Sequence, residues 1–190
     1  NSDKIRREFP FVKVMIVEKP FLDHDFAYLN PNQFEAGQSN PASVMGMFIG
    51  LSRLINCIEN SPIKYSHVLR LRTDMIIFGD NFYENLENYM STDHVHTSQN
   101  YLIPYKWLSD HIILAPTKYF VSLWPNKIDI KFYKNYKKIG LNPEKFLAFQ
   151  AKKFQSKIKP TFIRYSDYQI VYSTQNKNDP SWVKKITREN

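Results

Sequence analysis

The chain has 190 residues, a length typical of one domain, and no apolar run in it approaches the ~20 residues that span a bilayer. Its formal net charge is +8, from 26 Lys and Arg against 18 Asp and Glu, which favours an anionic partner: a phosphate-bearing substrate, nucleic acid or an acidic membrane surface. A solvated lysine-rich surface is the alternative, and it explains the charge taken alone better. The single cysteine, Cys57, excludes an internal disulfide and indicates a reducing compartment, and five glycines provide no Gly-rich phosphate loop.

The N-terminal part of the chain predicts a strand, a loop and a helix. Phe11–Val17 is an apolar, β-branched run typical of a buried strand, and the polar stretch 18–40 predicts a long loop. A helix is predicted for Asn40–Asn60, with Asn40 as the N-cap, and we expect Cys57 to be a small buried residue on it. Its apolar stripe comprises Val44, Met47, Phe48, Leu51, Leu54, Ile55 and Ile58.

The rest of the chain alternates short strands with helices. The predicted elements are a strand at Tyr65–Asp74, a helix from a cap at Asp80 to Met90, a hairpin of Val95–Ser98 and Tyr101–Ile103, a strand at Ile112–Ala115, a helix capped by Thr117 and ending at Trp124, a helix from the Asn142 cap to about Lys157, and a strand at Thr161–Tyr165. This order predicts one α/β domain over 1–190, with helices on both faces of a mixed sheet and a polar tail from about 173.

The segment His67–Asp74 carries the first candidate functional residues. Because side chains alternate along a strand, Arg70, Arg72 and Asp74 are predicted to share one face. Arginines in an apolar strand need partners, and their guanidinium groups suit phosphate. Asp74 comes where the strand should end, and a carboxylate there can hold Mg²⁺ or Mn²⁺ bridging a diphosphate. The alternative is a surface face on which Arg72 and Asp74 pair with each other.

A second candidate group directly precedes the predicted strand Ile112–Ala115. Asp110 can act as a general base that removes a proton from a substrate hydroxyl, and His111 can do the same or contact phosphate. Asp is also a common turn residue, which is the alternative here. For Asp110 to share a cleft with Asp74, the Ile112 strand must run antiparallel to the His67 strand, or a loop must fold back over the rim.

Two segments carry a family resemblance. The sequences KYSHVLRLRTDMIIF and WLSDHIILAPTKYFVSLW, in this order, resemble WavE-like glycosyltransferases of bacterial lipopolysaccharide and capsule synthesis, over roughly Asn40 to Tyr165. The resemblance implies a GT-A-like, Rossmann-related domain whose first strand lies upstream of Asn1. The residues that match the site of that family are Arg72 and Asp74 at the metal and diphosphate, Ser109, Asp110 and Glu144 on the acceptor side, and Arg164 near the phosphates.

We therefore expect an enzyme that moves a sugar from a nucleotide-sugar donor to a bacterial surface glycan, assisted by Mn²⁺ or Mg²⁺. In this interpretation Asp74 holds the metal, Arg70 and Arg72 bind the donor phosphates, and Asp110 with His111 is catalytic. Lysine-rich segments favour a cytoplasmic enzyme in peripheral contact with the inner membrane.

Two alternatives remain open at this point. A nucleic-acid-binding or processing domain would explain the charge and the aromatic content, but no pattern of nucleic-acid readers is present and we expect no such partner. A non-catalytic carbohydrate-binding protein would keep the fold without the chemistry.

Overall fold

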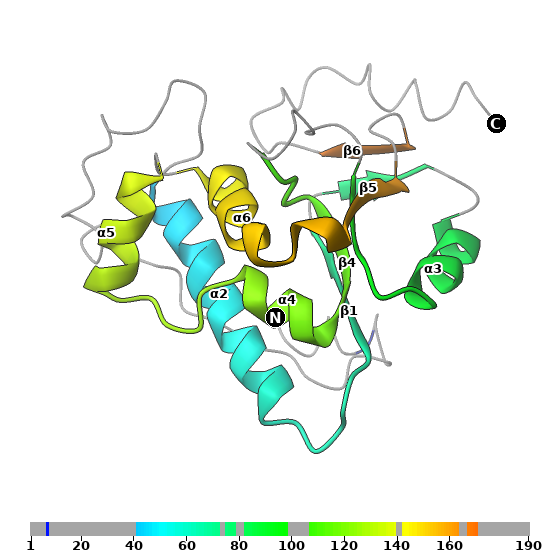
Figure 1. The fold of residues 1–190 in the computed structure, drawn as a ribbon, viewed down its shortest axis with the longest axis horizontal. Coiled ribbons are helices and arrows are strands. Elements are labelled where there is room, and N and C mark those ends of the chain that lie inside the picture. The colour runs from blue at the N-terminus through cyan, green and yellow to red at the C-terminus, as the bar shows by residue number, and fades with distance from the viewer. Residues whose placement is uncertain are drawn as a thin grey trace.

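A mixed four-stranded sheet lies at the centre of the computed structural model (Figure 1). The structure describes residue 7 and the ranges 41–72, 75–78, 82–98, 107–139, 142–163 and 167–170. The sheet order is β1 (His67–Leu71), β4 (Ile112–Pro116), β3 (Val95–Ser98) and β5 (Ile158–Ile163). β4 is antiparallel to both its neighbours, whereas β3 and β5 are parallel, so the predicted mixed α/β sheet is confirmed.

Helices cover both faces of this sheet, as predicted. The helices are α2 (Pro41–Glu59), α3 (Phe82–Met90), α4 (Thr117–Leu123), α5 (Ile130–Lys138) and α6 (Pro143–Ala151), followed by the 3₁₀ segment η4 (Lys152–Lys157). Residues of α2, α4, α5 and α6 form one hydrophobic core with the first face. On the second face, α3 packs together with a two-stranded antiparallel sheet of β2 (Met75–Ile77) and β6 (Tyr168–Ile170).

The alternation of side chains along β4 explains why both faces are covered. Ile113 and Ala115 belong to the larger core on the first face, whereas Ile112 and Leu114 belong to the smaller core on the second. All four side chains are at most 1% exposed. A strand that is buried on both faces requires a continuous apolar sequence, which IILAP provides.

Much of the aromatic content fills the larger core. The ring of Phe48 on α2 is fully buried and lies with its centroid 5.1–6.2 Å from those of four other rings: Trp124, Phe132, Tyr136 and Phe146. Three of these pairs have the edge-to-face geometry that aromatic quadrupoles favour. These rings join α2 to α4, α5 and α6, so they stabilise the fold and are not available to stack on a ligand.

The predicted helix at Asn40–Asn60 is confirmed, but two of its side chains lie elsewhere than expected. Leu51 and Ile55 are buried in the larger core, whereas Leu54 is 38% exposed and Cys57 is exposed. Each helical residue advances by about 100°, so Cys57 lies about 200° around the helix from Ile55 and points away from the core. The prediction of a buried cysteine was therefore wrong.

Local hydrogen bonds explain how the other helix boundaries differ from the predictions. Asn142 caps α6 as predicted, since its side chain accepts from the backbone N–H of Lys145 at 2.8 Å. Thr117 is not a cap: it is the first residue of α4, and its hydroxyl donates to the carbonyl of Tyr65 at 2.6 Å. The helix predicted to reach Lys157 ends at Ala151, because the chain continues as η4 with a non-helical backbone at Phe154.

The strand predicted for Tyr65–Asp74 is shorter than expected. β1 ends at Leu71, and Met75–Ile77 pairs with β6 in the separate two-stranded sheet. The strand predicted at Thr161–Tyr165 corresponds to β5, which begins earlier, at Ile158, because Ile158 and Lys159 already pair with β3. Several predictions lie outside the described residues: the strand Phe11–Val17, the loop 18–40, the caps at Asn40 and Asp80, the second arm of the hairpin at Tyr101–Ile103, and the tail from 173.

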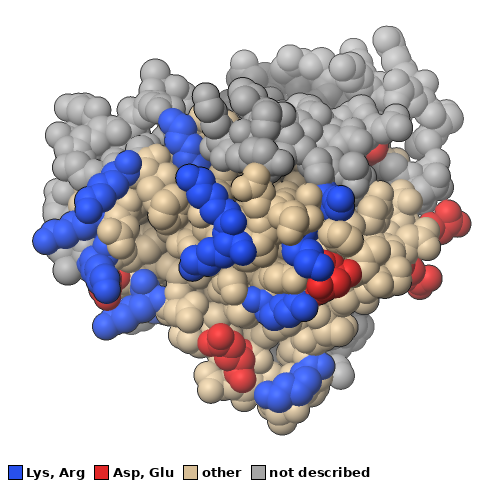
Figure 2. Space-filling view, viewed as in Figure 1, with Lys and Arg blue, Asp and Glu red and all other residues tan. Residues whose placement is uncertain are grey.

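Lysines and arginines are spread over the face formed by α5, α6 and η4 (Figure 2). Among the described residues of α5 and η4, the exposed lysines are Lys131, Lys134 and Lys138 on α5, and Lys152 and Lys153 on η4. Among the described residues, none of the helices combines the length and the apolar character needed to cross a membrane.

Candidate functional site

The pairing of β1 with β4 brings the two predicted motifs together. Leu71, the last residue of β1, pairs with Ile112, the first residue of β4. Asp110 and His111 directly precede β4, so the antiparallel register places them beside the carboxyl end of β1. This is the antiparallel arrangement that the sequence-based prediction required. It brings Asp110 to the edge of the sheet where β1 ends and the chain continues toward Arg72 and Asp74. Asp74 itself lies outside the described residues.

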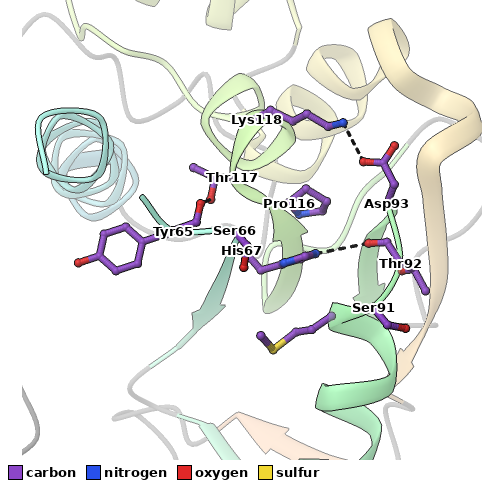
Figure 3. Close-up of a pocket in the computed structure, with 10 residues that line it drawn as sticks. Tyr65, Ser66, His67, Ser91, Thr92, Asp93, Pro116, Thr117 and Lys118 are labelled. Atoms are coloured by element: carbon purple, nitrogen blue, oxygen red, sulfur yellow. Dashed lines mark hydrogen bonds and ion pairs between the residues drawn. The ribbon is translucent and has the colours of Figure 1, made fainter. Parts of the chain in front are cut away.

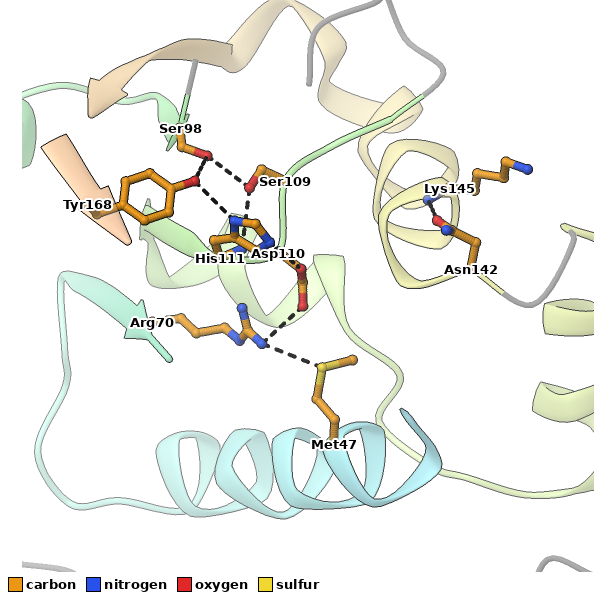
Figure 4. Close-up of polar contacts among 9 residues, drawn as sticks. All are labelled: Met47, Arg70, Ser98, Ser109, Asp110, His111, Asn142, Lys145 and Tyr168. Atoms are coloured by element: carbon orange, nitrogen blue, oxygen red, sulfur yellow. Dashed lines mark hydrogen bonds and ion pairs between the residues drawn. The ribbon is translucent and has the colours of Figure 1, made fainter. Parts of the chain in front are cut away.

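Arg70 and Asp110 form a buried ion pair (Figure 4). The Arg70 Nη2 atom lies 3.3 Å from Asp110 Oδ2, and the two side chains are 10% and 5% exposed. The guanidinium also lies 5.1 Å from the centroid of the Trp124 ring, and its Nη2 lies 3.5 Å from the sulfur of Met47. The sequence indicated that Arg70 needs a partner, and the structure provides Asp110 as that partner.

Glu144 is brought to the same place by the start of α6. The Asn142 cap fixes the first turn of this helix, and the backbone N–H of Leu108 donates to the carbonyl of Glu144 at 3.1 Å. The bond ties the segment that leads to Asp110 to the turn that carries Glu144. As a result, Asp110, His111 and Glu144 can each offer one ligand atom such that all three atoms lie within 4.8 Å of one another.

Burial and the nearby negative charge of Asp110 oppose the ionisation of the Glu144 carboxyl. Burial raises the pKa of the Glu144 carboxyl, and the negative charge of Asp110 raises it further. Hydrogen bonds and the positive charge of Arg72 act in the opposite direction but are weaker. The site therefore holds two carboxylates close together, with Arg70 bound to one and Arg72 acting on the other.

A chain of hydrogen bonds holds His111 from the second face of the sheet (Figure 4). Tyr168 on β6 donates its hydroxyl hydrogen to Ser98 Oγ at 3.2 Å, and Ser98 donates to Ser109 Oγ at 2.8 Å. His111 Nδ1 lies 3.0 Å from the Tyr168 oxygen, and the backbone N–H of His111 donates to Ser109 Oγ at 3.3 Å. All four side chains are buried, so the imidazole ring has one fixed orientation.

Six of the predicted site residues thus converge, and the structure adds two more. The converging residues are Arg70, Arg72, Ser109, Asp110, His111 and Glu144, whereas Asp74 and Arg164 lie outside the described residues. The sequence prediction missed Ser98 and Tyr168. A signal for Tyr168 was present, because Tyr168 and Ile170 alternate with a polar residue as in a short half-buried strand.

A hollow lies at the opposite end of β1 from Asp110 (Figure 3). It has a volume of about 450 Å³, and its walls come from the start of β1, the end of α3 and the β4–α4 junction. Its carboxylate, Asp93, is already bound by Lys118 at 2.8 Å and Lys157 at 2.9 Å. None of the predicted site residues that the structure describes lines it.

Comparisons with models of known protein families, with curated proteins and with solved structures find no match to this chain. The chemistry of the site therefore has to be inferred from its own residues.

Proposed function

We propose that this chain is a metal-assisted glycosyltransferase that moves a sugar from a nucleotide-sugar donor to a bacterial lipopolysaccharide or capsule acceptor. The observation that carries the proposal is the convergence of Arg70, Asp110, His111 and Glu144 at the carboxyl end of β1, within the electrostatic reach of Arg72. In α/β sheets this end of a strand is where ligands bind. Asp74 follows β1 only three residues after its last residue, Leu71. The resemblance to WavE-like enzymes, with their GT-A-like domain, supports the same interpretation.

The proposed reaction needs positive charge beside the departing diphosphate. The oxygen of the acceptor hydroxyl attacks the anomeric carbon of the donor sugar, the bond from this carbon to the β-phosphate oxygen breaks, and the nucleoside diphosphate leaves. The hydroxyl proton passes to a nearby base or to the departing diphosphate. A divalent cation and arginine side chains stabilise the charge that develops on the leaving group. In our proposal Asp74 holds the cation, and Arg72, Arg70 and the later Arg164 supply the remaining positive charge.

Asp110 has two possible roles that predict different effects of the substitution Asp110→Asn. If Asp110 removes the proton of the acceptor hydroxyl, turnover falls by a factor of ~10²–10⁴ while donor affinity is unchanged. If Asp110 binds the cation, donor affinity and turnover fall together. The Oδ2 atom of Asp110 is bound to Arg70, so either role falls to Oδ1, which lies 3.9 Å from His111 Nε2.

The basic face over α5, α6 and η4 is proposed to hold the enzyme near its acceptor. A lysine near an anionic membrane surface contributes ~1 kcal/mol of attraction, and lipid-linked acceptors lie at the anionic inner leaflet. We therefore propose a cytoplasmic enzyme in peripheral contact with the inner membrane.

A thermal-shift screen of nucleotide sugars, each with and without Mn²⁺, tests the proposal. A ligand at a hundred times its dissociation constant stabilises a fold by ~2.7 kcal/mol, which is readily measured. We expect one donor to raise the melting temperature only when Mn²⁺ is present. Stabilisation by oligonucleotides at low salt, with no response to any nucleotide sugar, would favour nucleic-acid binding instead.

A further inference from the structure

Three groups that bind cations converge at the carboxyl end of β1. The Asp110 carboxylate, the His111 imidazole and the Glu144 carboxylate each present one ligand atom within 4.8 Å of the other two. Asp110 Oδ1 and His111 Nε2 are 3.9 Å apart, which is too long for a hydrogen bond. Two ligand atoms that each lie ~2.1 Å from one ion are separated by at most ~4.2 Å. The distance between these two atoms therefore allows an ion between them, and Glu144 offers a third ligand atom within 4.8 Å of both.

The hydrogen-bond chain behind His111 is compatible with the tautomer that directs a lone pair into this gap. A hydroxyl group has one hydrogen, and that of Tyr168 is assigned to the contact with Ser98 Oγ. With this direction of the chain, the Tyr168 oxygen accepts from the Nδ1–H of His111, 3.0 Å away. In a neutral imidazole with its hydrogen on Nδ1, Nε2 carries a lone pair. His111 Nε2 and Asp110 Oδ1 are then two electron-pair donors that face each other, an arrangement that a cation between them stabilises.

The surrounding charges determine what a bound ion would contribute to the site. Two carboxylates, those of Asp110 and Glu144, lie close together at this site. Arg70 binds the other oxygen of Asp110 and leaves Oδ1 directed at His111. The two arginines only balance the two carboxylates, so a divalent ion would give the site a net positive charge.

We propose that Asp110, His111 and Glu144 bind a divalent first-row transition cation such as Mn²⁺, at a site separate from the one that the proposed function assigns to Asp74, with Tyr168 as the positioning residue for the imidazole. One nitrogen and two carboxylate oxygens favour such an ion over Mg²⁺ or Ca²⁺, which prefer oxygen ligands alone. The inference deepens the proposed function, because a site with a net positive charge attracts the donor diphosphate. It rests on the proposed function only for the role of the ion. Asp110 then acts as a ligand and not as the general base.

Electron paramagnetic resonance of Mn²⁺ added to the protein, without any nucleotide, tests the site directly. We expect electron spin-echo modulation from a nitrogen ligand in the unaltered protein, and we expect that modulation to change when the histidines carry ¹⁵N. The modulation should disappear in His111→Gln. In Tyr168→Phe the nitrogen signal should remain, whereas Mn²⁺ affinity falls by ~10–100-fold, as for loss of a partner that orients a ligand.

Matched substitutions separate this site from other acids. Glu144→Gln should weaken Mn²⁺ binding by at least ~10-fold, as expected when a direct ligand is lost. Asp93→Asn, which alters an exposed carboxylate paired with lysines, should leave the affinity unchanged. Asp74→Asn should keep the nitrogen modulation, even if it weakens nucleotide-dependent binding.

Two results would overturn the inference. One is bound Mn²⁺ that gives no nitrogen modulation in the unaltered protein, a result that does not depend on how any variant folds. The other is equal affinity in the unaltered protein, His111→Gln and Glu144→Gln, which would make the cluster an ion-pair network alone. Because nucleotide is absent throughout, neither result depends on whether the chain binds a sugar donor.

Discussion

Replacing Arg70 by Met tests the buried ion pair at the centre of the site. Met keeps a long apolar side chain against Trp124 but leaves the Asp110 carboxylate, 5% exposed, without the guanidinium that lies 3.3 Å away. Removing one partner of a buried pair costs ~3–5 kcal/mol, because the remaining charge stays buried. With a urea m-value of ~2 kcal/mol/M, the unfolding midpoint should fall by ~1.5–2.5 M.

The double substitution Arg70→Met with Asp110→Asn shows where this cost comes from. It leaves no uncompensated charge, so it should destabilise the protein by less than the sum of the two single substitutions, with a coupling of ~0.5–3 kcal/mol. Asp93→Asn is the control, since the Asp93–Lys118 pair is 47% and 63% exposed and should change the midpoint little. Strictly additive single and double effects in urea unfolding would refute the coupling of Arg70 and Asp110.

Three further predictions concern stability. Leu51 is 8% exposed in the larger core, so Leu51→Ala should cost ~2–5 kcal/mol in urea unfolding; an unchanged midpoint would show that this face of α2 is not packed. The pKa of Glu144 is raised above its ordinary value of 4.5, chiefly by burial, so the folded state holds this proton more tightly than the unfolded state. Without metal, stability should therefore fall as the pH rises from 4.5 through the folded-state pKa, and Glu144→Gln should remove this slope; the same slope in both proteins would contradict the assignment. Burial lowers the pKa of His96 from 6.5 to about 4, so stability should be lost as the pH falls through this range, as the unfolded state takes up the proton first. Urea midpoints at several pH values test this, and His96→Gln should lose less stability over the range than the unaltered protein does.

The strongest periodic patterns in the sequence predicted their elements well. The stripe through Val44, Phe48, Leu51 and Ile55 located α2, and the apolar run before Pro116 located β4. The Asn142-Pro143-Glu144 pattern located the start of α6, since an N-cap acts through bonds within one turn. Signals of this kind depend on neighbouring residues alone, so they can be read without knowledge of the tertiary structure.

Elements that depend on distant contacts were missed or misjudged. Lysines dominate α5, and its two buried rings, Phe132 and Tyr136, have their partners on α2 and α6. The short strands β2 and β6 exist as a pair that joins residues about ninety positions apart, as in Met75 with Ile170. The Arg70–Asp110 pair and the Tyr168–His111 contact likewise join residues 40 and 57 positions apart, so the sequence could propose their residue types but not their partners.

The most direct test of the proposed activity is the release of nucleoside diphosphate from nucleotide sugars. The unaltered protein is incubated with each donor, with bacterial glycan fractions as acceptors, and with or without Mn²⁺, and Asp110→Asn is assayed beside it. We predict that one donor is cleaved only when the cation is present and that Asp110→Asn loses both this cleavage and the affinity for the donor. No cleavage of any donor by the unaltered protein, or a cation-independent cleavage that Asp110→Asn retains in full, would contradict the proposal.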